Sequence, residues 1–109
     1  MQAGTGNEAR HQVNYLARHR TFIASLGCLL AKQGVSGCAG TTELHHVAEG
    51  SGIRNEWALV PLCEAHHRGQ AGLHGMGTKA FIRLYRPPGD SEFGLLIWLL
   101  ESMAHRRAA

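Results

Sequence analysis

The sequence predicts a small single domain of the α+β class, with a hairpin of two short strands and a short helix between two flanking helices. Three observations predict this fold. The chain has 109 residues, which is one domain at most. Segments with the apolar spacing of helices lie near both ends, and two short apolar runs lie between them. Five of the eight histidines gather around those runs, between residues 44 and 74.

The N-terminal part predicts a short arm and then a helix. Residues 1–7 are polar and glycine-rich, and we expect them to be disordered. Over residues 8–26 a broken stripe of apolar side chains predicts a helix, which ends at Gly27.

Two strands are expected in the middle of the chain. A loop at 32–42 contains glycine and serine, and residues 43–47 then predict a short strand. Turn-forming residues fill the next loop, at 49–55. Residues 57–62 are apolar and predict the second strand, which should end near Pro61.

Helices are expected in the C-terminal part. A short helix should begin near Glu64, and four glycines interrupt the chain after it. Thr78 can cap a helix at 79–86, which the two following prolines stop. A last helix is expected from Glu92 to about Ala104, capped by Asp90 or Ser91. It is apolar nearly all round, so it should be buried on more than one side, in the core or in a homodimer interface.

Charge and cysteine content narrow the functional class. The net charge is +3 and the sequence pI is about 9.1, which is compatible with a polyanionic partner. Nothing resembles an export signal, and the longest apolar run, 95–100, is too short for a membrane span. An odd number of cysteines, three, then favours metal ligands over disulfides. We expect a cytoplasmic protein without a membrane partner.

Two histidine doublets about twenty residues apart are hard to explain by core packing. They stand in E-L-H-H-V at 43–47 and in P-L-C-E-A-H-H at 61–67, and G-L-H follows at 72–74. Imidazole and thiolate bind zinc-like ions, and imidazole also transfers protons near neutral pH. This part of the chain therefore predicts a metal site that carries out chemistry.

The order of a histidine pair, a strand, Cys-x-x-His-His and a further histidine matches a ββα-metal site. His45, His67 and His74 would bind the ion, and His46 would be the general base. An ion that neutralises phosphoryl and leaving oxygens, together with a base that takes a proton from water, is enough to cleave a phosphodiester. The alternative is that one doublet is structural and the other is solvated.

A structural zinc site is also predicted. Cys63 and His66 have the Cys-x-x-His spacing that lets two ligands from one turn reach a tetrahedral ion. Cys28 and Cys38 would complete the site, although nine residues separate them instead of the usual two to four. The alternative is that Cys28 is an ordinary buried thiol.

Further polar residues near these sites have candidate roles. The amide of Asn55 could orient the general base, and a turn asparagine is an equally good interpretation. Basic residues around the site are candidates for contacts with DNA phosphates, although singly each is more typical of a solvated surface: Arg54, Arg68, Lys79, Arg83 and Arg86. The glycines of 72–77 do not form a phosphate loop, and we expect them to let the backbone wrap so that His74 reaches the ion.

With these residues, the chain resembles the HNH endonucleases, and among them the phage recombination-enhancement (Ref-like) and related phage HNH nucleases. The resemblance covers about residues 19 to 86. It lies in H-R-T-F-I-A-S-L-G-C (19–28), E-L-H-H-V (43–47), V-P-L-C-E-A-H-H (60–67) and G-L-H-G-M-G-T-K-A-F-I-R-L-Y (72–85).

The resemblance implies a ββα-metal (HNH) fold with a structural Zn²⁺, and a catalytic Mg²⁺ or Mn²⁺ in whose place Zn²⁺ can also bind. It implies cleavage of DNA with little sequence preference, and a phage or prophage origin. It implies the same residue roles: His45, His67 and His74 bind the catalytic ion, His46 is the general base, and Cys63 and His66 bind zinc. The chain would divide into an N-terminal flexible or helical arm at 1–18, an HNH nuclease core at 19–86 and a C-terminal helix at 87–109.

The sequence departs from the family pattern at three points. More than the usual three residues separate His67 from His74, the first cysteine pair is widely spaced, and Asn55 lies a residue or two from the position of the middle residue of the HNH name. The recombinase-dependent members also have a long basic N-terminal extension, and this chain has only a short one. A RecA-type recombinase is therefore a partner that the sequence allows but does not imply.

The leading hypothesis is a metal-dependent DNA endonuclease, acting in the cytoplasm of the bacterial host if a phage encodes it. The alternative is a catalytically inactive, zinc-stabilised DNA-binding module. His46 and His74 argue against that alternative, because such a module needs neither. A third hypothesis is a protein-interaction domain that uses the apolar C-terminal helix.

Overall fold

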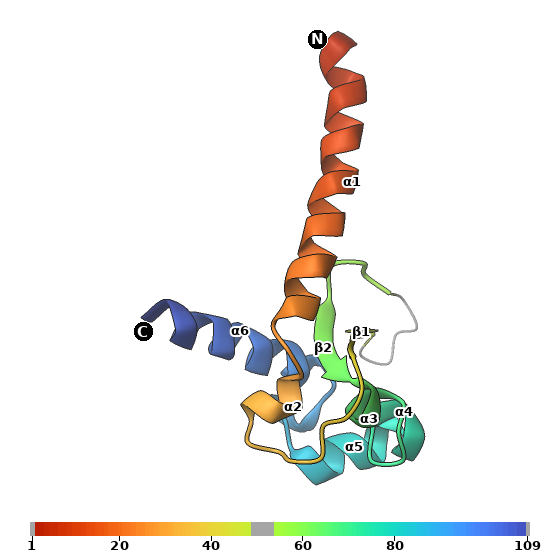
Figure 1. The fold of residues 1–109 in the computed structure, drawn as a ribbon, viewed down its shortest axis with the longest axis vertical. Coiled ribbons are helices and arrows are strands. Elements are labelled where there is room, and N and C mark those ends of the chain that lie inside the picture. The colour runs from red at the N-terminus through yellow and green to blue at the C-terminus, as the bar shows by residue number, and fades with distance from the viewer. Residues whose placement is uncertain (1, 49–53, 109) are drawn as a thin grey trace.

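The computed structural model describes residues 2–48 and 54–108, with side chains from residue 14 to residue 105. Figure 1 shows a small hairpin surrounded by helices, with the first and last helices extending away from it in different directions. In chain order the elements are α1 (Gln2–Ser25), α2 (Leu29–Lys32), β1 (Thr42–His46), β2 (Leu59–Cys63), α3 (Glu64–His67), α4 (Leu73–Met76), α5 (Thr78–Tyr85), the 3₁₀ turn η1 (Pro88–Asp90) and α6 (Phe93–Ala108).

The hairpin sets the position of the histidines. β1 and β2 are antiparallel, with His45 opposite Val60 and His46 opposite Leu59. Pro61 lies in the middle of β2, opposite Leu44, and the strand ends two residues after it, at Cys63. A two-stranded sheet has an open edge on each strand, so a proline without an N–H can be accommodated there.

Every residue of β2 is buried, because helices cover it. α1 packs on both strands of the hairpin, and α2 and α6 pack against β2. Ile23, near the end of α1, and Leu26, just after it, belong to the buried core. The radius of gyration is 15.7 Å, against about 13 Å for a compact chain of 100 residues. The projecting part of α1, drawn in red in Figure 1, accounts for this elongated shape. The fully buried centre of the core consists of Leu29, Leu30, Leu59, Val60, Leu62, Leu73, Phe81 and Leu95.

The predicted α+β class with a hairpin-plus-helix core and flanking helices is confirmed, and several boundaries are corrected. α1 begins at Gln2, so residues 2–7 are helical and not disordered. Adding a residue to an existing helix costs far less than starting one, and no proline interrupts this segment. The short helix α2 was not predicted, because four residues are too few to show a helical period. Of the predicted loop at 49–55, residues 49–53 lie outside the described residues.

The C-terminal helices also differ in detail. Thr78 is the first residue of α5, and Gly77 precedes it as the cap, so the predicted hydroxyl cap is absent. Asp90 belongs to η1 and pairs with Arg86 at 3.4 Å. In α6, Leu95 and Leu99 are buried, whereas Phe93 and Leu100 are 51% and 62% exposed. Burial in the core is therefore confirmed for one face of α6, and burial of the other face in a homodimer interface stays a prediction.

Glycines let α4 fold back closely against α3. A Cβ on Gly72 would lie 2.7 Å from the carbonyl oxygen of Ala65, and one on Gly75 would overlap the carbonyl oxygen of Gly69. Any larger residue would push α4 away, because real Cβ atoms do not approach a carbonyl so closely. The glycine-rich segment thus sets the distance between His67 and His74.

In the part of the chain that the structure describes, no helix combines the length and apolar character needed to cross a membrane.

Candidate metal centres

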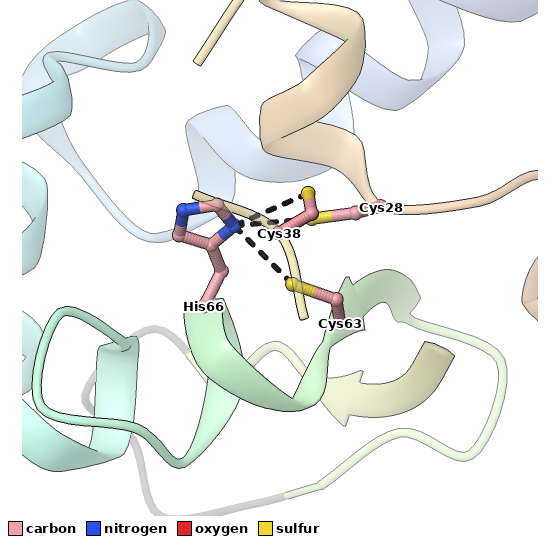
Figure 2. Close-up of side chains that lie close together, drawn as sticks. All are labelled: Cys28, Cys38, Cys63 and His66. Atoms are coloured by element: carbon pink, nitrogen blue, oxygen red, sulfur yellow. Dashed lines mark hydrogen bonds between the residues drawn. The ribbon is translucent and has the colours of Figure 1, made fainter. Parts of the chain in front are cut away.

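Three cysteines and one histidine meet where four segments of the chain converge. Cys28 precedes α2, Cys38 lies in the loop between α2 and β1, Cys63 ends β2, and His66 lies on α3. Their side chains point toward one another in Figure 2. The Nδ1 atom of His66 is 3.6 Å from the Sγ of Cys28, 3.6 Å from that of Cys38 and 3.3 Å from that of Cys63. The structure therefore brings together the four residues of the predicted zinc site, here called the cysteine cluster.

The distances in the cysteine cluster match ligands arranged around one ion. A single imidazole N–H cannot donate to three sulfurs at once. With Zn–S near 2.3 Å and Zn–N near 2.0–2.1 Å, tetrahedral angles separate sulfur from nitrogen by about 3.6 Å. All four ligand atoms lie within 4.8 Å of one another. This donor set fits a tetrahedral Zn²⁺.

The pKa values of the cysteines indicate that a cation is needed here if all three are to be thiolates. Burial, and then the nearby thiols of Cys63 and Cys28, raise the pKa of Cys38 to about 12. Burial opposes ionisation of Cys63 as well, but backbone N–H groups of His66 and Ala39 donate to its sulfur and lower its pKa. Three thiolates cannot crowd together without a positive charge among them, and a bound metal ion supplies that charge.

His45, His67 and His74 form a second group, here called the histidine cluster. They come from β1, α3 and α4. The ring centroids of His45 and His67 are 5.4 Å apart, those of His45 and His74 5.2 Å, and those of His67 and His74 4.7 Å. One ring nitrogen from each lies within 4.8 Å of the others. The residues predicted to bind the catalytic ion are thus adjacent in space, as three ligands of one ion must be.

The hydrogen bonding of His67 and the protonation of His74 both suit a metal ligand. Glu43 accepts a hydrogen bond of 2.8 Å from Nδ1 of His67 and is also held by the guanidinium of Arg68. The bonds from Arg68 and then His67 lower the pKa of Glu43 to about 2, so it is an ionised acceptor and Nε2 of His67 is left for an ion. Burial, and then the nearby rings of His67 and His45, lower the pKa of His74 and favour its neutral, ligating form.

A cavity of about 390 Å³ opens at the histidine cluster. Its lining combines the three histidines of the cluster with His46, one cation, Arg54, and one carboxylate, Glu92. The residues that line it are Leu44, His45, His46, Ala48, Arg54, His67, His74, Thr78 and Glu92.

His46, the predicted general base, lines the same cavity from the end of β1. Its side chain is 20% exposed, and its Nε2 is 3.4 Å from a carboxylate oxygen of Glu56. Glu56 also pairs with Arg20 at 3.7 Å. If Nε2 donates to this carboxylate, Nδ1 is the ring atom that can accept a proton.

Asn55 makes the contact of a turn asparagine. Its Oδ1 accepts a hydrogen bond of 2.8 Å from the backbone N–H of Trp57, and its side chain is exposed. It is not among the residues that line the cavity. The side chain paired with His46 is that of the next residue, Glu56.

The predicted phosphate-binding residues are spread over different surroundings. Arg54 lines the cavity of the histidine cluster. Arg68 pairs with Glu43 and, at 3.8 Å, with Glu64. Lys79 and Arg83 occupy exposed positions of α5 and line a separate cavity of about 240 Å³.

Comparison with known proteins agrees with this geometry. No curated protein and no solved structure matches this chain. A family model described as recombination enhancement, RecA-dependent nuclease matches residues 15–96, which include both clusters and His46. The chain therefore belongs to the family of recombination-enhancement, RecA-dependent nucleases.

Proposed function

We propose that this protein is an HNH-type, metal-dependent endonuclease that hydrolyses DNA phosphodiester bonds with little sequence preference. The observation that carries the proposal is the arrangement of the histidine cluster, His46 and Arg54 around one cavity. A zinc-binding module without activity needs neither the second cluster nor a proton acceptor beside it.

The histidines and the arginine of the cavity each have a defined part in the proposed reaction. Mg²⁺ or Mn²⁺ bound to the histidine cluster would supply the positive charge that stabilises the phosphoryl and leaving oxygens. His46 would take a proton from the attacking water at Nδ1, while Glu56 holds its Nε2. Arg54 would bind a non-bridging phosphate oxygen and so orient the phosphodiester. The cysteine cluster would hold a structural Zn²⁺ that fixes α3, and with it His67.

Partners follow from the same proposal. The family description names RecA dependence, so we propose RecA on DNA as a partner, which the sequence alone left open. Phe93 and Leu100 of α6 expose apolar surface that a homodimer would bury, and the homodimer stays a prediction. A phage origin and a place in the host cytoplasm belong to the proposal as well.

Cleavage of supercoiled plasmid by the purified protein tests the proposal. We expect nicked or linear DNA with Mg²⁺ or Mn²⁺, none with EDTA, and more product when the DNA carries a RecA filament. DNA binding without cleavage under every one of these conditions would instead support the alternative, a catalytically inactive zinc-stabilised module.

DNA affinity should fall steeply with salt concentration. Contacts from three or four of the predicted cations would weaken binding roughly 40- to 150-fold between about 50 and 200 mM salt, because each neutralised phosphate releases counterions. Fluorescence anisotropy with labelled DNA measures this dependence. Arg54→Ala removes one predicted phosphate contact and should reduce the slope of log affinity against log salt concentration by about 1. An affinity that does not change with salt would contradict the proposed contacts.

A further inference from the structure

We propose that Glu92 is a positioning residue of the catalytic centre, which holds His45 so that its Nδ1 faces the ion of the histidine cluster. This inference rests on the proposed function. Glu92 lies 47 residues after His45, immediately before α6, and outside the hairpin and the two short helices, α3 and α4, that carry the histidine cluster.

The contact between the two side chains is short and protected from solvent. Oε2 of Glu92 is 2.7 Å from Nε2 of His45, and the two side chains are 12% and 7% exposed. A contact of this length between a carboxylate and an imidazole is a hydrogen bond that the carboxylate accepts, so Nε2 of His45 carries the hydrogen and Nδ1 keeps its lone pair.

The distance distinguishes a hydrogen-bond acceptor from a further ligand. Two ligand atoms bound at about 2.1 Å to one ion, at angles between about 90° and 109°, lie about 3.0 to 3.4 Å apart. The 2.7 Å contact is shorter than that and is typical of a charge-assisted hydrogen bond. Glu92 is also absent from the group of ligand atoms that lie within 4.8 Å of one another in the described chain. It therefore acts on the ion through His45.

The backbone around Glu92 keeps the carboxylate in place. The backbone carbonyl oxygen of Glu92 accepts a hydrogen bond of 3.0 Å from the N–H of Leu95, and the Leu95 side chain is fully buried. Gly94 packs so tightly on η1 that a Cβ there would clash with the carbonyl oxygen of Pro88. The start of α6 is thus anchored in the core, and Glu92 extends from this rigid point to the histidine cluster. Glu43 likewise holds a second residue of the histidine cluster, His67, through the other ring nitrogen, Nδ1.

Calorimetric titration of Mn²⁺ into the zinc-loaded protein tests this role. Glu92→Ala should weaken Mn²⁺ binding by about 10- to 100-fold, the usual effect of removing a hydrogen-bond partner of a metal-binding histidine. Glu92→Gln should lose less, because its amide oxygen can still accept from Nε2. Glu101→Ala changes an exposed carboxylate within α6, the helix that Glu92 precedes, and should bind Mn²⁺ like the wild type.

The ring nitrogens of His45 provide an independent measurement on the ion-free protein. In ¹H–¹⁵N spectra the wild type should show His45 protonated at Nε2 alone, and Glu92→Ala should show a mixture of tautomers. Unchanged Mn²⁺ affinity in Glu92→Ala, or an unchanged tautomer, would overturn the role of Glu92. Absence of Mn²⁺ binding by the wild type would overturn the proposed function, while the tautomer measurement would still decide what Glu92 does.

Discussion

Replacement of His46 by alanine should reduce DNA cleavage by a factor of about 100 to 10,000, the usual contribution of a general base. His46 lines the cavity beside the histidine cluster without belonging to it. The substitution removes the atom that accepts the proton and leaves the three candidate ligands in place. DNA affinity and Mn²⁺ affinity should therefore stay close to those of the wild type.

The expected loss is measured as the initial rate of plasmid cleavage at saturating Mn²⁺. His105→Ala is a matched control, since His105 is an exposed histidine near the end of α6, far along the chain from the cavity. Its rate should equal that of the wild type. A rate for His46→Ala within a factor of two of the wild type would exclude His46 as the base.

Cys63→Ser should remove the structural zinc and lower the free energy of unfolding by several kcal/mol, because metal binding and folding are coupled in small sites. Cys63 is the buried residue at which β2 ends and α3 begins. Without the zinc, the turn that directs His66 into one cluster and His67 into the other loses its crosslink to Cys28 and Cys38. The loss should thus extend to cleavage as well.

Thermal unfolding with and without a chelator measures this effect and provides its control. A chelator should lower the Tm of the wild type toward that of Cys63→Ser, and should leave the variant unchanged. Zinc content by atomic absorption should fall in parallel. A Cys63→Ser variant that keeps its zinc and its Tm would show that the cysteine cluster is not a metal site.

The local chemistry of the chain could be predicted from sequence because it depends on short spacings. Cys63 and His66 lie one helical turn apart, and a doublet at the end of a strand places His45 and His46 at one site. The gaps from Cys28 to Cys38 and from His67 to His74 are wide, yet the structure brings the residues of each pair into one cluster. In the second case, glycines at 72 and 75 allow the backbones to approach.

The carboxylates around the histidines were not predicted. Glu43 had a signal, since residues two apart on a strand share a face and His45 follows it at that distance. Glu56 lies beside Asn55, and the sequence could not distinguish which of the two reaches His46. Glu92 had no local signal, because its contact with His45 depends on how η1 and α6 return the chain to the hairpin.

The helical ends were the least predictable part. Residues 2–7 contain two glycines, yet they continue α1. The apolar residues of α6 predicted burial on more than one side, in the core or in a homodimer interface, and in the described chain the helix leaves the body after its first turns and exposes Leu100. Both outcomes depend on how far a helix extends beyond its contacts, which sequence periodicity does not encode.

The central claim is that the histidine cluster holds the ion used for cleavage and that His46 acts beside it. Titration of Mn²⁺ into plasmid-cleavage reactions with His45→Ala and His46→Ala tests this claim most directly, with calorimetry to measure ion binding. His45→Ala should need at least about tenfold more Mn²⁺ for half-maximal cleavage, because it lacks a ligand. His46→Ala should need the same Mn²⁺ concentration as the wild type and reach a much lower maximum. If His46→Ala binds the ion poorly and His45→Ala binds it normally, the two roles are exchanged, and if both variants cut like the wild type, this cavity is not the active site.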